Sequence, residues 1–195
     1  MGRWVPGARG RMAEAAAELF AERGFEETTA GDIAARAGVT ERTFFRHFTD
    51  KREVLFDGSE AMERAVREAI AGADPDAAPL AAALTGVRAA VGLLDQIRDH
   101  AVRRAAIIAS APSLQERELL KLALMADYIN QALQQRGVAE PTAALAAQSA
   151  ITVFQTAFTR WIAASGSPRL SDTLDEVAEE LRELTRRRPR GADRR

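Results

Sequence analysis

The sequence contains no cysteine, and it has only two histidines, His47 and His100, and two lysines, Lys51 and Lys121. The absence of cysteine excludes disulfides, thiol catalysis and cysteine-ligated metal, and is expected for a protein of the reducing cytoplasm. Two histidines far apart in sequence do not make a structural zinc site. We therefore expect neither a metal nor a cofactor.

The sequence also lacks long apolar runs. None approaches the about 20 residues that cross a bilayer, and the N-terminal MGRWVPGARGR lacks the apolar segment of a signal peptide. We therefore expect a cytoplasmic protein without a membrane partner. Hydrophobic residues make up 47% of the 195, which favours a folded globular chain. The net charge of −1 argues against indiscriminate binding to nucleic acid, so specific binding would need a local positive face.

The most informative stretch runs from Thr28 to Leu55 and predicts two short helices joined by a tight turn, with another helix directly behind. A small residue, Ala34, is followed four residues later by Gly38 and six residues after that by Phe44. Gly38 can take the positive φ of the turn, and Thr40 can cap the next helix by accepting from its free N–H groups. The predicted inner face consists of Ile33, Val39, Phe44 and Phe48.

The second of these short helices has an apolar back and a polar front. At about 100° per residue, Phe44 and Phe48 share one stripe, whereas Arg42, Thr43 and Arg46 point roughly the other way. A short helix of this kind fits the major groove of DNA. The spacing alone leaves open a plain helical hairpin with a solvated, charged face.

A longer pattern surrounds this stretch. AAAELFAERGFEETT lies upstream, the AGVT turn lies in the middle, and FFRHFTDKREVL leads into a fourth helix. With these segments, residues 12–56 resemble the N-terminal domain of the TetR family of transcriptional regulators. The resemblance covers about a quarter of the chain, and the remainder is similar to the family only in length and all-helical layout.

The resemblance implies DNA contact through the two short helices. Phe45 stands where a tyrosine is usual, and Gly31 offers no side chain, so specificity is expected to rest on Arg42 at a guanine edge. Glu41 would accept from a cytosine amino group. The implied base-reading positions are Gly31, Glu41, Arg42 and Phe45, the implied phosphate contacts are Thr29, Thr43, His47 and Lys51, and we expect Thr40 and Arg46 on the same surface.

Helical patterns and breakers alternate along the whole chain. We expect disorder over 1–10, a first helix from Arg11 to Gly24, and one long helix over 51–71 capped by Thr49 and Asp50. GADPDAAP at 72–79 would end this helix. Further helices are expected over 80–94, 98–110, 112–136 and 141–165, and a last one is expected to begin with Ser171 and Asp172 as caps.

These patterns predict an all-α fold in two parts. An N-terminal three-helix helix-turn-helix DNA-binding domain at 1–56 would be followed by a helical ligand-binding and dimerisation domain at 57–188 and a basic tail at 189–195. The tail, like Arg3, Arg9 and Arg11, is open to either phosphate contact or simple solvation.

The last two helices are the predicted dimer interface. The helix over 141–165 is apolar on more than one side, so one side would face the chain's own core and the other a second subunit. The resemblance also implies a four-helix interface, although Phe158 or Trp161 can equally belong to the monomer core. The predicted interface residues are Phe158, Trp161, Leu174, Val177, Leu181 and Leu184.

The helices between 80 and 165 carry more apolar bulk than a spacer needs, and the resemblance implies a ligand cavity among them. Ordinary core packing explains any single residue as well. We predict a small hydrophobic ligand lined by Met62, Val87, Val91, His100, Ile107, Leu122, Met125, Ile129, Phe154, Gln155 and Phe158.

Pattern and resemblance together predict a dimeric repressor that binds a palindromic operator in double-stranded DNA and is released by a small hydrophobic ligand. Two other classes stay open. No nucleophile in a recognisable motif accompanies His100, which argues against a helical enzyme. The polar front of the helix over 40–47 argues against an adaptor that binds only protein. We therefore expect no enzymatic activity.

Overall fold

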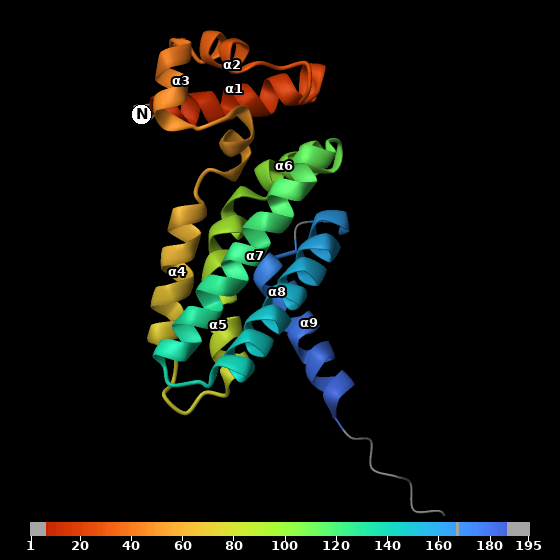
Figure 1. The fold of residues 1–195 in the computed structure, drawn as a ribbon. Helices are drawn as coiled ribbons and strands as arrows, with labels where there is room; N and C mark the ends of the chain where they lie inside the picture. Colours follow the sequence, from red (N-terminus) through yellow and green to blue (C-terminus); the bar gives the residue numbers. More distant parts are fainter. Residues whose placement is uncertain (1–6, 167, 187–195) are drawn as a thin grey trace, which may run out of the picture. The chain divides into compact units, whose positions relative to one another are not determined.

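The computed structural model describes residues 7–166 and 168–186, and this part of the chain folds into α-helices, two short 3-10 helices and loops (Figure 1). No strand occurs among these residues, so the predicted all-α class is confirmed. Residues 1–6, which include Arg3, and the predicted basic tail at 189–195 lie outside the described residues. The chain divides into two compact units, the first made of Met1–Ala65 with Ile97–Met125 and the second of Val66–Gln96 with Ala126–Arg195.

The first unit is built from two separate stretches of the chain. Its apolar cluster joins Met12, Ile33 and Phe44 to Ile107 and Leu114, which come from much later in the sequence. The unit therefore contains more than the predicted domain at 1–56, whose functional boundary stays a prediction. Its elements are α1 (Ala8–Arg23), α2 (Ala30–Arg36), α3 (Glu41–His47), η1 (Lys51–Phe56), the start of α4 (Ser59–Ala71), α6 (Arg98–Ala109) and the start of α7 (Pro112–Gln135).

Ion pairs tie η1 to α6 and α7 within this unit. The Arg104 guanidinium donates to the carbonyl of Leu55 at 2.6 Å and pairs with Glu118 at 2.6 Å. Arg117 donates to the carboxylate of Glu53 at 2.6 Å. Partial burial raises the pKa of Glu53, but Arg117 and Lys121 outweigh it, so the net pKa is lowered. The charge of Glu53 is thus held in place between two cations.

Two predicted helix boundaries in the first unit are wrong. The first helix begins at Ala8 rather than Arg11, so residues 8–10 are helical. The predicted long helix over 51–71 is two elements, because the chain turns at Gly58 with φ +89 before α4 begins. Asp50 caps η1 as predicted, since its carboxylate accepts from the N–H of Arg52 at 2.7 Å.

The second unit packs α8 and α9 against α5. Its interior is filled from several helices, with Val91, Ile129, Ala157 and Leu174 all at most 1% exposed. Its elements are α5 (Pro79–Leu94), most of η2 (Asp95–Ile97), α8 (Glu140–Ala163), α9 (Leu170–Thr185) and the ends of α4 and α7. These bounds agree with the predicted helices to within about two residues.

The predicted caps of the last helix are wrong. Neither Ser171 nor Asp172 caps α9, which begins at Leu170 with Arg169 at its cap position and no side-chain cap from that residue. The carboxylate of Asp95 instead accepts from the N–H of Leu170 at 2.5 Å. The Ser171 side chain is buried within the second unit.

Neither a single membrane-spanning helix nor a metal-binding cluster occurs in the part of the chain that the structure describes. No single helix there is long and apolar enough to span a membrane, and only α5 and α6 taken as a bent pair meet the length and composition criteria. No group of three or more His, Asp or Glu side chains is placed to hold a metal ion in these residues.

The close approach of α4 and α5 in the second unit depends on Gly86. A Cβ at this position would lie 2.7 Å from Cγ1 of Ile70 and 3.2 Å from Cγ1 of Val66, and both side chains are fully buried. Gly86→Ala is therefore expected to lower the free energy of unfolding by about 1–2 kcal/mol. Urea denaturation measures this change. Gly92→Ala on the same helix, where a Cβ meets nothing within 4 Å, is the control and should be neutral or stabilising. Equal stability of the Gly86 variant and the parent would contradict the packing argument.

Candidate nucleic-acid interface

A reciprocal cap starts α2. The Thr29 hydroxyl oxygen accepts from the N–H of Asp32 at 3.1 Å, and the Asp32 carboxylate accepts from the Thr29 N–H at 2.9 Å and from its hydroxyl at 2.6 Å. These bonds, the hydroxyl bond first, lower the pKa of Asp32. Sequence reasoning missed this cap, although a threonine three residues before an acidic residue is a recognised signal for it. The Thr29 hydroxyl therefore already both donates to and accepts from Asp32 within the protein.

The turn between α2 and α3 has the predicted geometry. Gly38 adopts φ +69, in the left-handed region that other residues reach only at a cost. The N–H of Val39 donates to the carbonyl of Ala34 at 2.9 Å. The Thr40 hydroxyl oxygen accepts from the N–H of Thr43 at 3.1 Å and caps α3. These local bonds fix the direction in which α3 leaves the turn.

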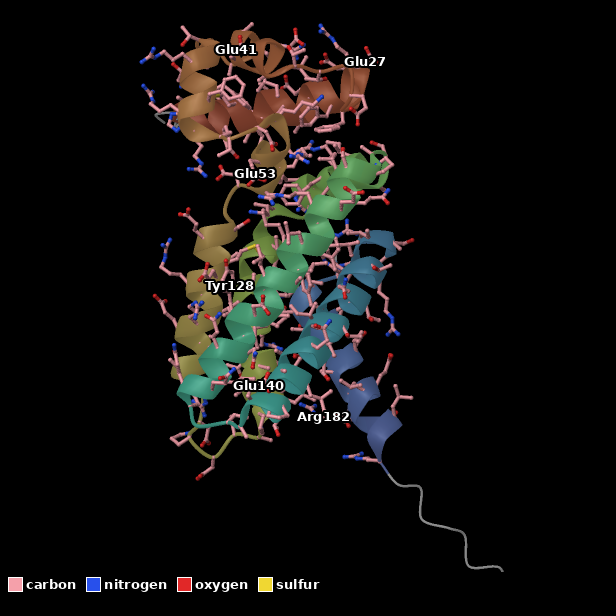
Figure 2. The ribbon with its side chains drawn as sticks, in the orientation of Figure 1. Glu27, Glu41, Glu53, Tyr128, Glu140 and Arg182 are labelled. Carbon is pink, nitrogen blue, oxygen red and sulfur yellow. The ribbon has the colours of Figure 1, made fainter. Side chains whose placement is uncertain are left out.

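The two faces of α3 are as predicted. Phe44 is fully buried and Phe48 is 3% exposed, and their rings lie 5.4 Å apart in the core of the first unit. Away from this core, Arg42 and Arg46 are exposed and Phe45 is 52% exposed. Glu41, labelled in Figure 2, is exposed at the start of the helix. The helix is thus fixed by its back and presents a mixed, arginine-bearing front.

The arginines of this front differ from several others in the first unit, which pair with carboxylates. Arg42 and Arg46 form no ion pair with any residue that the structure describes, so their guanidinium groups are solvated. Solvated guanidinium groups on an exposed helix can contact base edges and phosphates. Several other cations of the unit are paired with carboxylates, as in Arg9–Asp57, Arg36–Glu18, Arg36–Glu22, Arg52–Asp50, Arg104–Glu118, Arg117–Glu53 and Lys121–Glu53.

Lys51 has a structural position that the sequence did not indicate. Its ammonium donates to the carbonyls of Phe25 at 2.8 Å, Thr28 at 3.0 Å and Glu26 at 3.2 Å, and lies 4.3 Å from the centre of the Phe25 ring. An ammonium has three N–H donors, so all of them are used. The expected phosphate contact would cost one of these bonds, and it stays a prediction. Lys51 ties η1 to the loop between α1 and α2.

The N-termini of α2 and α3 approach each other at Gly31. A Cβ there would lie 3.6 Å from the hydroxyl oxygen of Thr29 and 3.7 Å from a carboxylate oxygen of Glu41, which is ordinary contact. The Glu41 carboxylate thus lies beside the space that a side chain at this position would occupy. Space for a methyl group exists, although the position carries none.

Gly31→Ala is expected to raise the free energy of unfolding by about 0.5–1 kcal/mol, because alanine loses less backbone entropy in a helix. Thermal denaturation measures the change. Gly38→Ala is the control and should destabilise, since the backbone there is left-handed. A Gly31 variant less stable than the parent would show that the methyl group is not accommodated.

The remaining predicted contacts lie at the two ends of α3. The hydroxyls of Thr40 and Thr43 are 2.9 Å apart and share a hydrogen bond. His47 is half-buried and lines a depression of about 290 Å³ in the first unit. Three cationic side chains, Arg9, Arg64 and Lys121, and three carboxylates, Glu53, Asp57 and Glu60, line this depression, so their charges cancel. The depression therefore has no excess positive charge that would favour a phosphate.

The predicted ligand-binding residues are divided between the two units, with Met62, His100, Ile107, Leu122 and Met125 in the first and the other six in the second. Ile107 packs in the cluster that contains α1, and His100 and Gln155 are exposed. Neither unit brings all eleven together, so the cavity stays a prediction. In the second unit, Val87, Val91 and Ile129 are buried, and the half-buried rings of Phe154 and Phe158 lie 5.8 Å apart.

The single chain already buries half of the predicted dimer interface. Trp161 and Leu174 are 1% exposed and Val177 is 5% exposed, so they belong to the core of the second unit. The indole N–H of Trp161 donates to the carbonyl of Pro168 at 2.9 Å. Phe158 and Leu181 are half-buried, whereas Leu184 is 82% exposed. The exposed side of α8 carries polar residues such as Gln148, Thr152 and Gln155, together with Leu145, which is 70% exposed.

An all-α chain with a capped helix-turn-helix and an exposed, arginine-bearing second helix has the architecture of helix-turn-helix proteins. Residues 13–57 match the model of the family described as bacterial regulatory proteins, tetR family. Residues 13–57 are therefore similar to the N-terminal domain of that family.

Two regulators are similar in sequence. TcmR of Streptomyces glaucescens is 36% identical over 91 residues, which cover 47% of this chain and 39% of TcmR. The repressor KstR2 of Mycobacterium tuberculosis is 45% identical over 47 residues, which cover 24% of each chain. The chain thus spans about two fifths of the length of TcmR and a quarter of that of KstR2.

One solved structure is similar over nearly the whole chain. FadR of Thermus thermophilus, a TetR-family transcriptional repressor in complex with lauroyl-CoA, is 24% identical with a TM-score of 0.56. The match covers 96% of this chain and 100% of that chain. At this identity the likeness establishes the shared fold.

Proposed function

We propose that this regulator is a repressor that reads a palindromic DNA operator through the front of α3. The observation that carries the proposal is the pair of solvated arginines, Arg42 and Arg46, on a helix held rigidly by the buried Phe44. A guanidinium can donate two hydrogen bonds to the O6 and N7 atoms of guanine. Glu41 can accept from a cytosine amino group, and the Phe45 ring can pack on a thymine methyl.

The proposed repressor acts as a homodimer. A recognition helix of seven residues touches too few base pairs to select one site in a genome. Two copies related by a twofold axis double the number of base pairs that are read, and the site then has matching symmetry. The similarity to KstR2, which is named a repressor, supports the sign of regulation.

Selection from a random pool of DNA duplexes tests this function. The expected result is an enriched palindrome whose half-sites lie about one helical turn or a multiple of it apart, bound with an affinity that falls steeply as salt rises. A scrambled duplex of the same composition is the control. Failure to enrich any sequence, or enrichment of a site without symmetry, would show that the proposed function is wrong.

We also propose that a small hydrophobic ligand releases the operator. The apolar content of α5, α7 and α8 supports this, as does lauroyl-CoA bound to the similar fold of FadR. A ligand that prefers the DNA-free conformation shifts the population toward it, and DNA lowers ligand affinity by the same factor. A preference of about 100-fold would weaken operator binding by at most that factor, or about 2.7 kcal/mol.

A thermal-shift screen with fatty acids, acyl-CoA thioesters and other hydrophobic compounds tests ligand release. Each compound that raises the melting temperature is then added to an operator titration, where we expect a higher apparent Kd. Coenzyme A without an acyl chain is the control. Compounds that bind tightly but leave DNA affinity unchanged would refute release by ligand, and DNA binding itself would be unaffected by that result.

A further inference from the structure

Glu53, labelled in Figure 2, is held by two cations that lie one helical turn apart on α7. Nε of Arg117 donates to one carboxylate oxygen at 2.6 Å, and Nζ of Lys121 donates to the other at 3.4 Å. Both oxygens are therefore engaged, each by a different side chain. Because charge-assisted hydrogen bonds are strong and directional, they fix both the position and the rotation of the carboxylate.

The end of η1 is held by α6 and α7 together. The Arg104 guanidinium of α6 donates to the backbone carbonyl of Leu55, and it forms two hydrogen bonds to the carboxylate of Glu118 on α7, at 2.6 and 3.3 Å. The same guanidinium lies 4.9 Å from the centre of the Phe56 ring. We call the charged side chains of this cluster the η1 clamp: Glu53, Arg104, Arg117, Glu118 and Lys121.

The η1 clamp is shielded from water more than the ion pair that joins α1 to α2. Its five side chains are between 19% and 28% exposed, whereas Arg36 and Glu22 are 36% and 50% exposed. The attraction between charges grows as water is excluded, and dissolved salt then screens it less. The η1 clamp therefore remains a firm attachment at physiological ionic strength.

The start of η1 is attached to the helix-turn-helix. Three hydrogen bonds from Lys51 join it to the loop between α1 and α2. The six residues of η1 thus connect the helix-turn-helix to α6 and α7 by directed bonds at both ends. Apolar contacts through Ile107 and Leu114 also join these parts, but apolar attraction does not depend on direction. The orientation is therefore fixed mainly by the η1 clamp.

This orientation matters because α7 continues beyond the first unit. The start of α7, up to Met125, belongs to the first unit, and the remainder, from Ala126, belongs to the second. A helix-turn-helix that is fixed on the start of α7 is fixed on a helix shared with the rest of the chain. When two copies read one operator, the separation and rotation of their α3 helices select the distance between half-sites.

We propose that the η1 clamp sets the half-site spacing that the protein accepts, with Glu53 as the positioning residue. The proposal rests on the proposed function, because a spacing exists only for an operator that two copies read. Glu53 contacts no base or phosphate and acts through η1 on the orientation of α3. One added base pair moves a half-site by about 3.4 Å and turns it by about 35°. A firmly held α3 cannot follow this change, so the DNA must deform instead.

Operators that differ only in spacing test the proposal. The selected palindrome is compared with duplexes whose half-sites lie one base pair closer together and one base pair further apart. For the parent protein, Kd should rise at least about tenfold on both altered duplexes, since they must be twisted to fit. For Glu53→Gln this rise should shrink to about threefold or less. A glutamine has one acceptor oxygen and no charge, so it cannot hold both cations.

The ratio of the Kd values separates orientation from stability. A variant that is only less stable contains less folded protein, and it binds all three duplexes more weakly by the same factor. Glu22→Gln is the matched control, since it removes the same charge from the ion pair between α1 and α2, and it should keep the ratio of the parent. Fluorescence anisotropy measures the affinities, and circular dichroism verifies that each variant folds.

Exchange of the two charges gives an independent measurement. Arg117→Gln should lower the ratio as Glu53→Gln does, because it removes the closer of the two cations. Glu53→Arg combined with Arg117→Glu keeps an ion pair between η1 and α7, and the new carboxylate lies one turn before Lys121. The combination should recover most of the ratio that each single change loses.

The possible outcomes separate the η1 clamp from the proposed function. A Glu53→Gln protein that discriminates the three spacings as sharply as the parent would refute the role of the η1 clamp and leave the proposed function standing. A parent that selects a palindrome but binds all three spacings equally would do the same. Failure of the parent to select any palindrome would refute both. If Glu53→Gln does not fold, Arg117→Gln and the combined variant decide the question by the same ratio.

Discussion

Arg42→Ala is expected to weaken operator binding by about 1–3 kcal/mol, or roughly 5- to 150-fold in Kd, and to relax the preference at one base pair of each half-site. The physical reason is the loss of a bidentate guanidinium contact from the exposed front of α3, where Arg42 has no ion pair with a described residue. Because the side chain makes no internal ion pair there, its removal should leave the folded state unchanged. Fluorescence anisotropy on the selected operator and on single-base variants measures both effects.

Arg103→Ala is the control for this experiment, since it removes an arginine that is also exposed but lies on α6. The control should alter affinity only slightly and uniformly across sequences. If the Arg42 variant selects the same site with the same affinity as the parent, Arg42 does not read a base. The specificity would then have to come from other residues of α3.

Lys51→Met is expected to lower the free energy of unfolding by about 2–4 kcal/mol, although the change keeps much of the side-chain volume. Three carbonyls of the loop between α1 and α2 lose their common donor, and the Phe25 ring loses its cation. Urea denaturation followed by circular dichroism measures the loss. DNA affinity under conditions where the variant stays folded measures any separate phosphate contact.

Lys121→Met is the contrast for this variant, because the only other lysine makes one long ion pair with Glu53 at 3.4 Å. It should cost less than about 1 kcal/mol. Lys51→Arg should restore only part of the stability, since a planar guanidinium cannot direct its protons as an ammonium does. A Lys51→Met protein as stable as the parent, but weak in DNA binding, would instead favour the phosphate contact.

The helix-turn-helix was predictable from sequence because its determinants are local. Gly38, Thr40 and Phe44 act on neighbours within a few residues, so their types and spacing indicate both the turn and the buried face. The Asp57–Gly58 pair is also a local turn signal, and overlooking it led to the wrong long helix. Where the signal is short-range, the sequence contains enough information to find the element.

The errors that remain involve residues far apart in the chain. The cap of α9 comes from Asp95, which lies 75 residues before Leu170, and no pattern around Ser171 indicates it. Periodicity predicted correctly that Leu174 and Trp161 are buried, but it does not say whether the covering surface belongs to the same chain. Likewise, the pattern of α3 indicates which of its side chains are candidates for DNA contact. The three hydrogen bonds that Lys51 donates to carbonyls depend instead on how the loop between α1 and α2 folds back onto η1.

The discontinuity of the first unit has a consequence for how the protein is made. Its apolar cluster needs Ile107, Ile108 and Leu114, and its ion pairs need Arg104 and Arg117. A ribosome synthesises all of α4 and α5 before any of these residues exist. The nascent N-terminal helices therefore emerge with part of their apolar surface uncovered, and they can complete their packing only after α6 and the start of α7 have left the exit tunnel.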